Sequence, residues 1–256
     1  MNILKAIVIG VLTLPFMALQ AADNTVPLRW HVTTITVNPA TQGQFEQMAA
    51  LYKAASEKVG DEPAWYAYSS GIGNTAMYTF ASPITSYGMF ADPADVVMRA
   101  FGAEKAAEAA SLAQASISDM TTAVYILRPE LGIAAADPDA VKEAVVTYQF
   151  VIKNGMEQQW ETGMKQLVEA HKKIGTNGHW QAFSGGFGAA GRFGIRAAVD
   201  WAELDVVGKR IPQILTEAYG ARAAAKMMAA NQEALESMEV TVERFRLDLS
   251  HLPASQ

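Results

Sequence analysis

The sequence predicts an α+β protein made of two tandem copies of one unit, in which strands and helices follow the order βαββαβ. The motif Trp-x-Ala-aromatic-Ser-x-Gly-x-Gly occurs at 65–73 and again at 180–188. The elements predicted around the two copies also follow the same order. A unit of this order folds as an antiparallel sheet with its helices on one face, so two units can pack sheet to sheet within one chain.

The first unit is expected at 28–131. Apolar residues at helical spacing predict a helix at 42–59. Asp92 and Pro93 predict the start of further helices, as N-cap and first helical residue, and alanine-rich sequence continues them to about residue 118. Segments rich in β-branched and aromatic residues predict strands at 29–37, 65–70, 76–81 and 121–127.

The second unit is expected at 144–249, after a linker at 132–143 rich in glycine, alanine, aspartate and proline. A helix is predicted at 156–174, and a longer helical stretch at 201–238 with breaks near Pro212 and Gly220. The predicted strands lie at 145–152, 180–184, 192–199 and 240–249.

Identical residues recur at equivalent places in the two units. The offset is 115 residues in the earlier part and 118 in the later part, which an insertion near Pro212 explains. The identities fall on turns, strand ends and apolar positions, where a shared backbone would demand them. They include the pairs Glu46/Glu161, Gly60/Gly175, Trp65/Trp180, Met120/Met238, Val124/Val242, Arg128/Arg246 and Leu131/Leu249.

The first 22 residues have the pattern of a secretory signal peptide. Lys5 supplies the positive charge, an apolar run follows to Leu19, and cleavage is expected after Ala21 or Ala22. The alternative is a retained N-terminal anchor helix, although the run is short for a membrane span. We therefore expect an exported protein, periplasmic or secreted, with no stable membrane insertion after cleavage.

Composition excludes several classes of function. The chain has a net charge of -6, which disfavours nucleic acid and anionic membrane surfaces as partners. It has no cysteine, so disulfides, thiolate catalysis and cysteine metal sites are excluded. The sequence contains no H-E-x-x-H, H-x-x-x-H or G-x-S-x-G motif.

The glycine-rich segment 186–191 matches G-x-G-x-x-G, the dinucleotide-binding pattern, which requires a helix to begin there. The equivalent segment at 71–76 leads instead into a predicted strand. The duplication therefore favours a hairpin turn over a nucleotide site in both copies.

The order of elements resembles that of the dimeric α+β barrel superfamily, whose units are ferredoxin-like, in a fused two-repeat form. The resemblance covers 28–249 as a pattern of elements, and no motif marks one member family. Relatives include antibiotic-biosynthesis-type monooxygenases, NIPSNAP-like proteins and chlorite-dismutase-like haem proteins. The resemblance implies an intramolecular barrel with a small molecule between the two sheets.

Tyr66 and Tyr68 are the first candidate ligand-binding residues, with Phe183 at the position equivalent to Tyr68. Trp65 and Trp180 are expected to pack against helices, and strand alternation would then turn Tyr66 and Tyr68 into the barrel. The two copies differ on this inner face, because Tyr66 corresponds to Gln181.

Histidines and arginines supply the remaining candidates. His31 and His171 have no histidine at the equivalent position in the other copy. His171 lies on a helix of the second unit, where the resemblance to chlorite-dismutase-like proteins would place a haem ligand; the alternative is surface variation. Arg128 and Arg246 end equivalent strands, and could bind a carboxylate or phosphate at the barrel mouth or form structural salt bridges.

No catalytic constellation is shared by the two units. The leading hypothesis is an exported protein that binds a small apolar or aromatic ligand between its sheets. The alternatives are a cofactor-independent oxygenase or isomerase, a haem-binding enzyme, and a protein-interaction module whose alanine-rich helices dock a second copy. The specific ligand or cofactor is not indicated by any motif.

Overall fold

The computed structural model describes residues 28–90, 95–135, 142–176, 178–205 and 211–252. We refer to the described residues up to 135 as the first half and those from 142 as the second half. The first half contains β1 (Arg29–Val37), α1 (Gln42–Val59), β2 (Tyr66–Ile72), β3 (Met77–Ile84), α2 (Val96–Phe101), α3 (Ala103–Ser116) and β4 (Ile117–Leu127), with short 3-10 helices η1 (Pro39–Thr41), η2 (Tyr87–Phe90) and η3 (Pro129–Leu131).

The second half has the same order of strands and helices. It contains β5 (Ala144–Ile152), α4 (Glu157–Ile174), β6 (Gln181–Gly185), β7 (Arg192–Val199), η4 (Trp201–Asp205), α5 (Ile211–Tyr219), α6 (Ala221–Ala234) and β8 (Leu235–Phe245). The segment 186–191 is the turn between β6 and β7 and contains no helix, as its likeness to segment 71–76 predicted.

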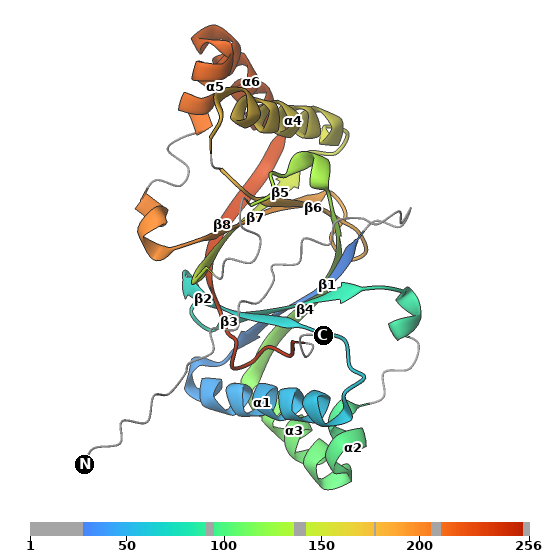
Figure 1. Ribbon diagram of the computed structural model, residues 1–256. Coiled ribbons are helices and arrows are strands. Elements are labelled where there is room, and N and C mark those ends of the chain that lie inside the picture. The colour runs from blue at the N-terminus through green and yellow to red at the C-terminus, as the bar shows by residue number, and fades with distance from the viewer. Residues whose placement is uncertain (1–27, 91–94, 136–141, 177, 206–210, 253–256) are drawn as a thin grey trace, which may run out of the picture.

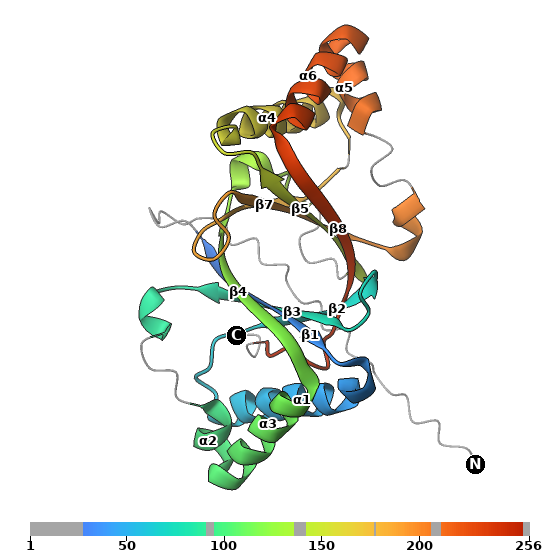
Figure 2. The ribbon, with the colours of Figure 1, turned by 180° about the vertical axis from the view of Figure 1, so that it is seen from behind.

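The eight strands form one closed antiparallel barrel in the order β1-β3-β2-β8-β5-β7-β6-β4, and β4 pairs with β1 to close it. Two of the ladders join the halves, β2 with β8 and β4 with β6. Figures 1 and 2 show the barrel in the middle, with α1, α2 and α3 on one side and α4, α5 and α6 on the other. The helices therefore cover the outer faces of the sheets and leave the barrel interior to side chains from the strands.

Each half has its own core between helices and sheet. In the first half Phe45 of α1 contacts Tyr78 of β3, with ring centroids 4.6 Å apart. At the equivalent place in the second half Trp160 of α4 contacts Phe193 of β7 at 4.4 Å. These rings are almost fully buried. Burial of such large apolar side chains is the main source of stability in a chain without disulfides.

Several element boundaries differ from the sequence prediction, and the differences at α2, β4 and β8 have identifiable physical causes. Helix α2 begins at Val96, and its N-cap is Asp95, whose carboxylate accepts hydrogen bonds from two backbone N–H groups; Asp92 lies outside the described residues. The last strands of both halves begin earlier than expected, β4 at 117 and β8 at 235. They do so because pairing with β1 and β5 extends to these residues and overrides the helical propensity of the alanine-rich segments.

The predicted linker and signal peptide fall largely outside the described residues. Residues 136–141 of the linker and all of residues 1–22 are among those not described. Within the described part of the chain, no helix is long and apolar enough to cross a membrane.

The two motif tryptophans contact the opposite half. The Trp65 indole Nε1 donates a hydrogen bond to the carbonyl oxygen of Leu249 at 3.0 Å, and that of Trp180 donates to Leu131 at 2.8 Å. Short backbone bridges, of Trp65 with His251 and of Ile133 with Trp180, flank these bonds. The indoles therefore anchor the segments that follow β8 and β4, a role beyond the helix packing expected for them.

A pair of arginines joins the halves in the same manner. Arg246 Nη1 lies 2.7 Å from Glu46 Oε1, and Arg128 Nη1 lies 2.8 Å from Glu161 Oε1. Arg246 also holds Asp248 through two hydrogen bonds. Hydrogen bonds from Arg246 lower the pKa of Glu46 and the pKa of Asp248 below their ordinary values.

The motif glycines allow the β2–β3 and β6–β7 turns to lie close against the opposite half. A Cβ on Gly71 would lie 2.7 Å from the Trp201 ring, and one on Gly188 would lie 2.7 Å from the carbonyl oxygen of Thr122. Gly188 also has a φ of 77°, which favours glycine. The repeated motif therefore marks the contacts by which the two halves close the barrel. We call these indole, arginine and glycine contacts the seam.

Candidate functional site

The barrel encloses a cavity of about 580 Å³. Its walls are the inward-pointing side chains of all eight strands, since alternate residues of a strand face one side of the sheet. Those used below are Trp30, Tyr66, Tyr68, Tyr125, Lys142, Thr147, Gln149, Gln181, Phe183, Arg192, Arg196, Glu239, Glu243 and Phe245.

Aromatic rings from the first half form one wall of the cavity. The rings of Trp30 and Tyr66 lie 5.8 Å apart and are tilted by 58°. The indole Nε1 of Trp30 is buried and has no hydrogen-bond partner in the described part of the protein. Burial raises the pKa of Tyr66 and that of Tyr125, the latter against the opposing effect of Arg192. Both phenols are therefore neutral near pH 7.

The second half contributes Arg196, Glu243 and Thr147 to a buried polar cluster that Tyr68 of the first half completes, and we call these four residues the Arg196 cluster. Arg196 Nη2 lies 3.2 Å from Glu243 Oε2, and the Thr147 hydroxyl donates to the same oxygen at 2.9 Å. Arg196 Nε donates to Thr147 Oγ1 at 3.3 Å. The guanidinium also lies over the Tyr68 ring, 4.3 Å from its centroid, in a cation–π contact.

Electrostatics keep the Arg196 cluster charged. Burial acts to lower the pKa of Arg196, but Tyr68 and Glu243 outweigh that effect and the net pKa is raised. Burial raises the pKa of Tyr68, and Glu243 adds to the rise while Arg196 opposes it. The cluster thus presents a fixed cation and a neutral phenol to the cavity.

The two halves place different chemistry at equivalent positions of the interior. Arg196 corresponds in register to Ala81, and Glu243 corresponds to Tyr125. The cavity-facing sides of the two halves therefore differ: Trp30, Tyr66 and Tyr125 of the first half form an aromatic wall, and Arg196 and Glu243 of the second half form a charged wall. Such a division can orient an amphipathic ligand, because the ligand's rings would contact the aromatic wall and its polar groups would contact the charged wall.

The two ends of the cavity also differ. Because β5 runs antiparallel to β7 and β8, residues late in β5 lie at the same end of the cavity as residues early in β7 and β8. Gln149, Arg192 and Glu239 meet this condition and make that end polar. Lys142 precedes β5 and lines the cavity near the other end, where it forms ion pairs with Asp200 at 2.6 Å and with Glu203 at 3.6 Å.

Of the residues singled out from the sequence, Tyr66, Tyr68 and Phe183 line the cavity. His31 does not line it; it points outward from β1 against Phe90, with ring centroids 5.1 Å apart, and burial lowers its pKa. The prediction of His31 as a ligand contact within the barrel therefore does not match its position, since its strand neighbours at even numbers face inward.

Arg128 and Arg246 also lie outside the cavity, as members of the seam. Their guanidinium groups are bound by carboxylates, and the Glu161 hydrogen bond is the largest of the influences that raise the pKa of Arg128. These contacts favour the salt-bridge alternative that the sequence left open over a site for a ligand anion.

His171 does not have the surroundings of a haem ligand. Its Nδ1 forms a short contact with the Thr176 hydroxyl, and its ring meets the edge of Trp180 at 4.9 Å between centroids. A Cβ on Gly178 would lie 2.6 Å from the ring, so the imidazole is closely packed. Burial lowers its pKa. The residues around His171 therefore do not fit a haem, and within the described residues no group of three metal-ligating side chains occurs.

Sequence reasoning missed Trp30 and the charged members of the Arg196 cluster. The signal that could have found Arg196 is a charged residue inside a predicted strand whose counterpart in the other copy, Ala81, is apolar. Glu243 carries the same signal, since its counterpart is Tyr125. Their contact requires the strand register, which the sequence pattern does not supply.

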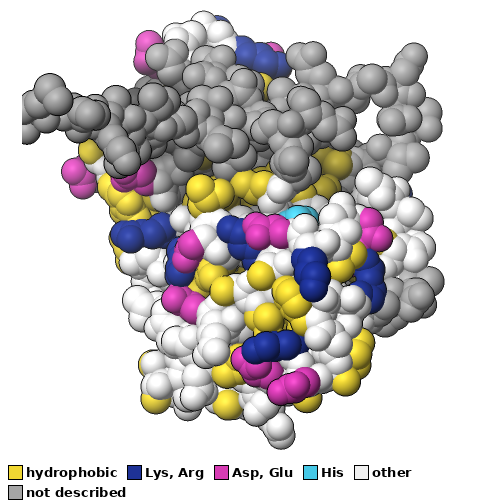
Figure 3. All heavy atoms as spheres, turned by 60° about the horizontal axis from the view of Figure 1, so that its bottom comes forward, with side chains coloured by type: hydrophobic (Ala, Val, Ile, Leu, Met, Phe, Trp, Pro, Cys, Tyr) yellow, Lys and Arg dark blue, Asp and Glu magenta, His cyan; other side chains and the backbone are white. Residues whose placement is uncertain are grey.

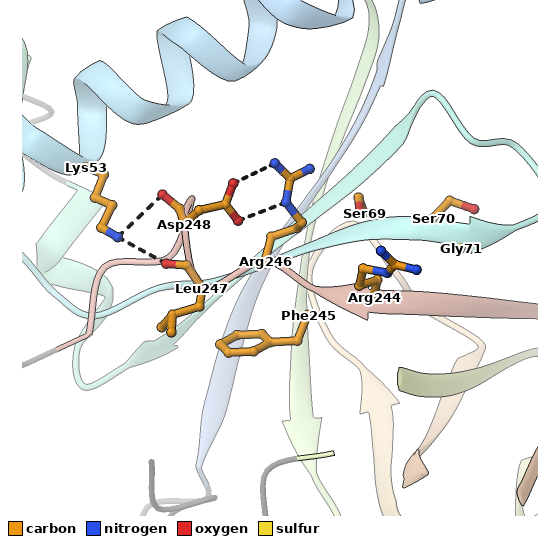
Figure 4. A pocket seen from close by; sticks show the side chains of 9 residues that line it. All are labelled: Lys53, Ser69, Ser70, Gly71, Arg244, Phe245, Arg246, Leu247 and Asp248. Carbon is orange, nitrogen blue, oxygen red and sulfur yellow. Dashed lines mark hydrogen bonds and ion pairs between the residues drawn. The ribbon is translucent and has the colours of Figure 1, made fainter. Parts of the chain in front are cut away.

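The outer surface offers less indication of a site. Figure 3 views the side that carries α1 to α3, where basic, acidic and apolar side chains are interspersed among the described residues. One outer cleft, shown in Figure 4, is considered separately below.

The fold and the enclosed cavity define the class of protein as an α+β barrel with a small-molecule-sized interior. No protein-family model matches the sequence, and no curated protein matches it. Several solved structures have the same fold at low sequence identity.

An anthrone oxidase-like protein is 10% identical, with a TM-score of 0.55 over 87% of this chain and 92% of that chain. A candidate monooxygenase from Fusobacterium nucleatum is 9% identical, with a TM-score of 0.53 over 87% and 94% of the two chains. A variant of the chlorite dismutase from Candidatus Nitrospira defluvii is 7% identical, with a TM-score of 0.53 over 88% and 94%. At these identities the likeness establishes the fold alone.

Proposed function

We propose that this protein binds a small aromatic molecule carrying an acidic oxygen group, such as a carboxylate, inside its barrel. The observation that carries the proposal is the divided interior, aromatic on the side of Trp30, Tyr66 and Tyr125 and charged at the Arg196 cluster. The cavity volume of about 580 Å³ falls within the range of roughly 300–1,000 Å³ typical of small-molecule sites.

The state of Arg196 supports an acidic group as the ligand's polar end. Its Nε donates to Thr147, its Nη2 donates to Glu243, and the guanidinium also interacts with the Tyr68 hydroxyl. A guanidinium has five N–H donors, and its planar shape matches a carboxylate. Because Glu243 and Tyr68 fix this side chain, little conformational entropy would be lost when a ligand binds.

The rings of the ligand would then contact the aromatic wall. Trp30 and Tyr66 are held at an angle, and Tyr125 and Phe183 line the cavity with them. Aromatic side chains bind aromatic ligands through burial of apolar area and through offset or edge contacts. The orphaned indole N–H of Trp30 would add a donor for an oxygen substituent on the ring.

We also infer that the chain is a fused form of two ferredoxin-like repeats, with the seam replacing a subunit interface. The equal order of elements and the paired contacts of Trp65 and Trp180 support this history. Export to the periplasm or exterior after removal of residues 1–22 is part of the same proposal, and N-terminal sequencing of the protein from its host would test it. Assembly with further copies is a question for native mass spectrometry.

A second candidate function is cofactor-independent oxygenation of the bound aromatic molecule. It is favoured by the enclosure of an acidic group, Glu243, beside the ligand space and by the names of two structural neighbours, an anthrone oxidase-like protein and a candidate monooxygenase. Consumption of dissolved oxygen by protein and an anthrone, faster than by Glu243→Gln protein and the same anthrone, would support it. Equal rates of oxygen consumption by the two proteins would refute the oxygenation candidate and leave only the binding proposal.

Isothermal titration calorimetry with 2-naphthoate and its neutral isostere 2-naphthamide tests the binding proposal. We expect the acid to bind about tenfold or more tightly than the amide, since a hydrogen bond to a charged group contributes about 1.5–3 kcal/mol. In Arg196→Gln/Glu243→Gln protein, which removes both charges together, the preference for the acid should disappear.

Arg222→Gln is the matched control, because Arg222 is exposed on α6 and does not line the cavity. This variant should retain the full preference for the acid. Failure of both naphthalenes to bind, or an undiminished preference in the double variant, would refute the proposal.

A further inference from the structure

A second hollow lies on the outside of the barrel, where β2 and β8 meet beside α1. It has a volume of about 790 Å³, and its lining includes Lys53, Ser69, Arg244, Phe245 and Arg246. Figure 4 shows Arg244 beside Ser69 and Ser70, whereas Arg246 points away from them toward Asp248. Three of the nine lining residues are basic and one is acidic, in a chain whose net charge is negative.

Two of the three cations already have partners. Arg246 binds Asp248 through two hydrogen bonds of 2.9 and 2.7 Å and binds Glu46 as part of the seam. Lys53 Nζ donates to the carbonyl oxygens of Leu247 at 3.0 Å and Asp248 at 3.4 Å. Arg246 is thus shared between two carboxylates, and Lys53 interacts electrostatically with Asp248 and lies 4.0 Å from Glu57.

Arg244 differs from the other two cations. Within the described part of the chain no carboxylate oxygen lies within 4.0 Å of its side-chain nitrogens, and its guanidinium is placed 5.7 Å from the centre of the Trp201 ring. Ser69 is the cross-strand partner of Arg244, and its hydroxyl has no hydrogen bond within the same described residues. On the outer face, a guanidinium with no carboxylate partner and a hydroxyl with no hydrogen bond, both judged within the described residues, therefore lie side by side.

The equivalent place on the other side of the barrel lacks these cations. Arg244 corresponds to Ile126 and Lys53 corresponds to Val168, while Arg246 corresponds to Arg128, a seam residue. The seam arginine is thus common to both sides, and the two additional cations occur on one side only. Barrel closure therefore does not account for Arg244, whereas Lys53 also joins the halves through its bonds to the carbonyl oxygens of Leu247 and Asp248.

We propose that this cleft is an anion-binding site that takes the carboxylate or phosphate group of a small molecule. Arg244 supplies the main charge and paired donors, the Ser69 hydroxyl supplies a further donor, and Lys53 adds positive potential at the rim. Trp201 keeps the guanidinium of Arg244 in place by a cation–π contact. This site is distinct from the barrel interior, although Phe245 lines both hollows.

The test is a calorimetric titration of the protein with sodium phosphate and, separately, with sodium acetate at constant ionic strength. We expect saturable binding of one anion per chain, and the stronger of the two titrations identifies the group. Arg244→Gln should weaken it by about tenfold or more, since the lost bonds are charge-assisted. Ser69→Ala should weaken it less, and Arg222→Gln should leave it unchanged.

Two crossed comparisons separate this site from the barrel. Arg196→Gln/Glu243→Gln protein should bind the inorganic anion as well as the natural protein does, and Arg244→Gln protein should retain the preference for 2-naphthoate over 2-naphthamide. Urea unfolding of each variant checks that it is folded. The proposal is overturned if neither anion binds, if Arg244→Gln leaves binding unchanged, or if the loss follows the Arg196 cluster instead.

Discussion

The contribution of the seam hydrogen bonds to stability can be measured by making the same substitution at three tryptophans, Trp30, Trp65 and Trp180. Changing each to phenylalanine removes about the same part of an indole. In Trp65 and Trp180 the change also removes a hydrogen bond from Nε1 to a backbone carbonyl oxygen, of 3.0 and 2.8 Å. In Trp30 it removes a buried N–H that has no partner among the described residues.

The difference between these variants should therefore isolate the bond. A typical intramolecular hydrogen bond contributes about 1 kcal/mol net, and removal of an unsatisfied buried donor costs nothing on this account. We expect Trp65→Phe and Trp180→Phe each to lower the free energy of unfolding by about 1 kcal/mol more than Trp30→Phe does. The two seam bonds are far apart in the barrel, so the double variant should show the sum within about 0.5 kcal/mol.

Urea unfolding followed by far-ultraviolet circular dichroism is the suitable assay, because tryptophan fluorescence changes with the substitutions themselves. Comparable slopes against urea in all four variants would confirm that the extent of unfolding is unchanged. If Trp30→Phe destabilises the protein as much as the other two, the indole bonds do not stabilise the seam and our account of the repeated motif is wrong.

Three further predictions concern the glycine, charged-cluster and pH behaviour of the barrel. Gly71→Ala should lower the free energy of unfolding in urea by about 1–3 kcal/mol, because the new Cβ would lie 2.7 Å from the Trp201 ring. Gly43→Ala, at a helical position with open space around it, should leave this free energy unchanged or raise it by up to about 1 kcal/mol. Arg196→Gln alone should lower the free energy of unfolding by about 3 kcal/mol, because it leaves the Glu243 carboxylate buried without its cation. Adding Glu243→Gln to this variant should restore most of the lost stability. Equal stability of the single and double variants would contradict this prediction. Glu46 and Asp248, the two carboxylates bound by Arg246, have lowered pKa values in the folded protein. As the pH falls, the unfolded chain therefore takes up protons at these groups before the folded protein does. Their contribution to stability is complete above the ordinary carboxyl pKa of about 4 and is lost as the pH falls through the lowered values. Arg246→Gln should therefore flatten the fall of stability in acid, and an unchanged profile would show that these pairs do not contribute.

Much of the architecture could be predicted from the sequence because it depends on local patterns. The hairpin at 186–191 followed from comparison with the glycine-rich turn of the other copy, and Tyr66 and Tyr68 were placed inward by strand alternation. The starts of β4 and β8 were missed because they depend on long-range pairing, which overrode the helical preference of alanine-rich sequence.

The candidate site was less accessible to sequence reasoning, and for a physical reason. Residues shared by the two copies, such as Trp65, Trp180 and Arg246, attract attention but hold the halves together. The cavity chemistry lies where the copies differ, as at Arg196 and Glu243. The fused repeat that we propose could vary its two inner walls independently, which a symmetric dimer of identical chains cannot do.

The most direct test of the central claim, an aromatic acid bound within the divided barrel, is a crystal structure of the protein with 6-bromo-2-naphthoate. The bromine gives an anomalous signal that locates the ligand without ambiguity. Our account predicts a peak inside the barrel beside Trp30 and Tyr66, with the carboxylate directed at Arg196. A peak confined to the outer cleft at Arg244, or an empty barrel at saturating ligand, would contradict it.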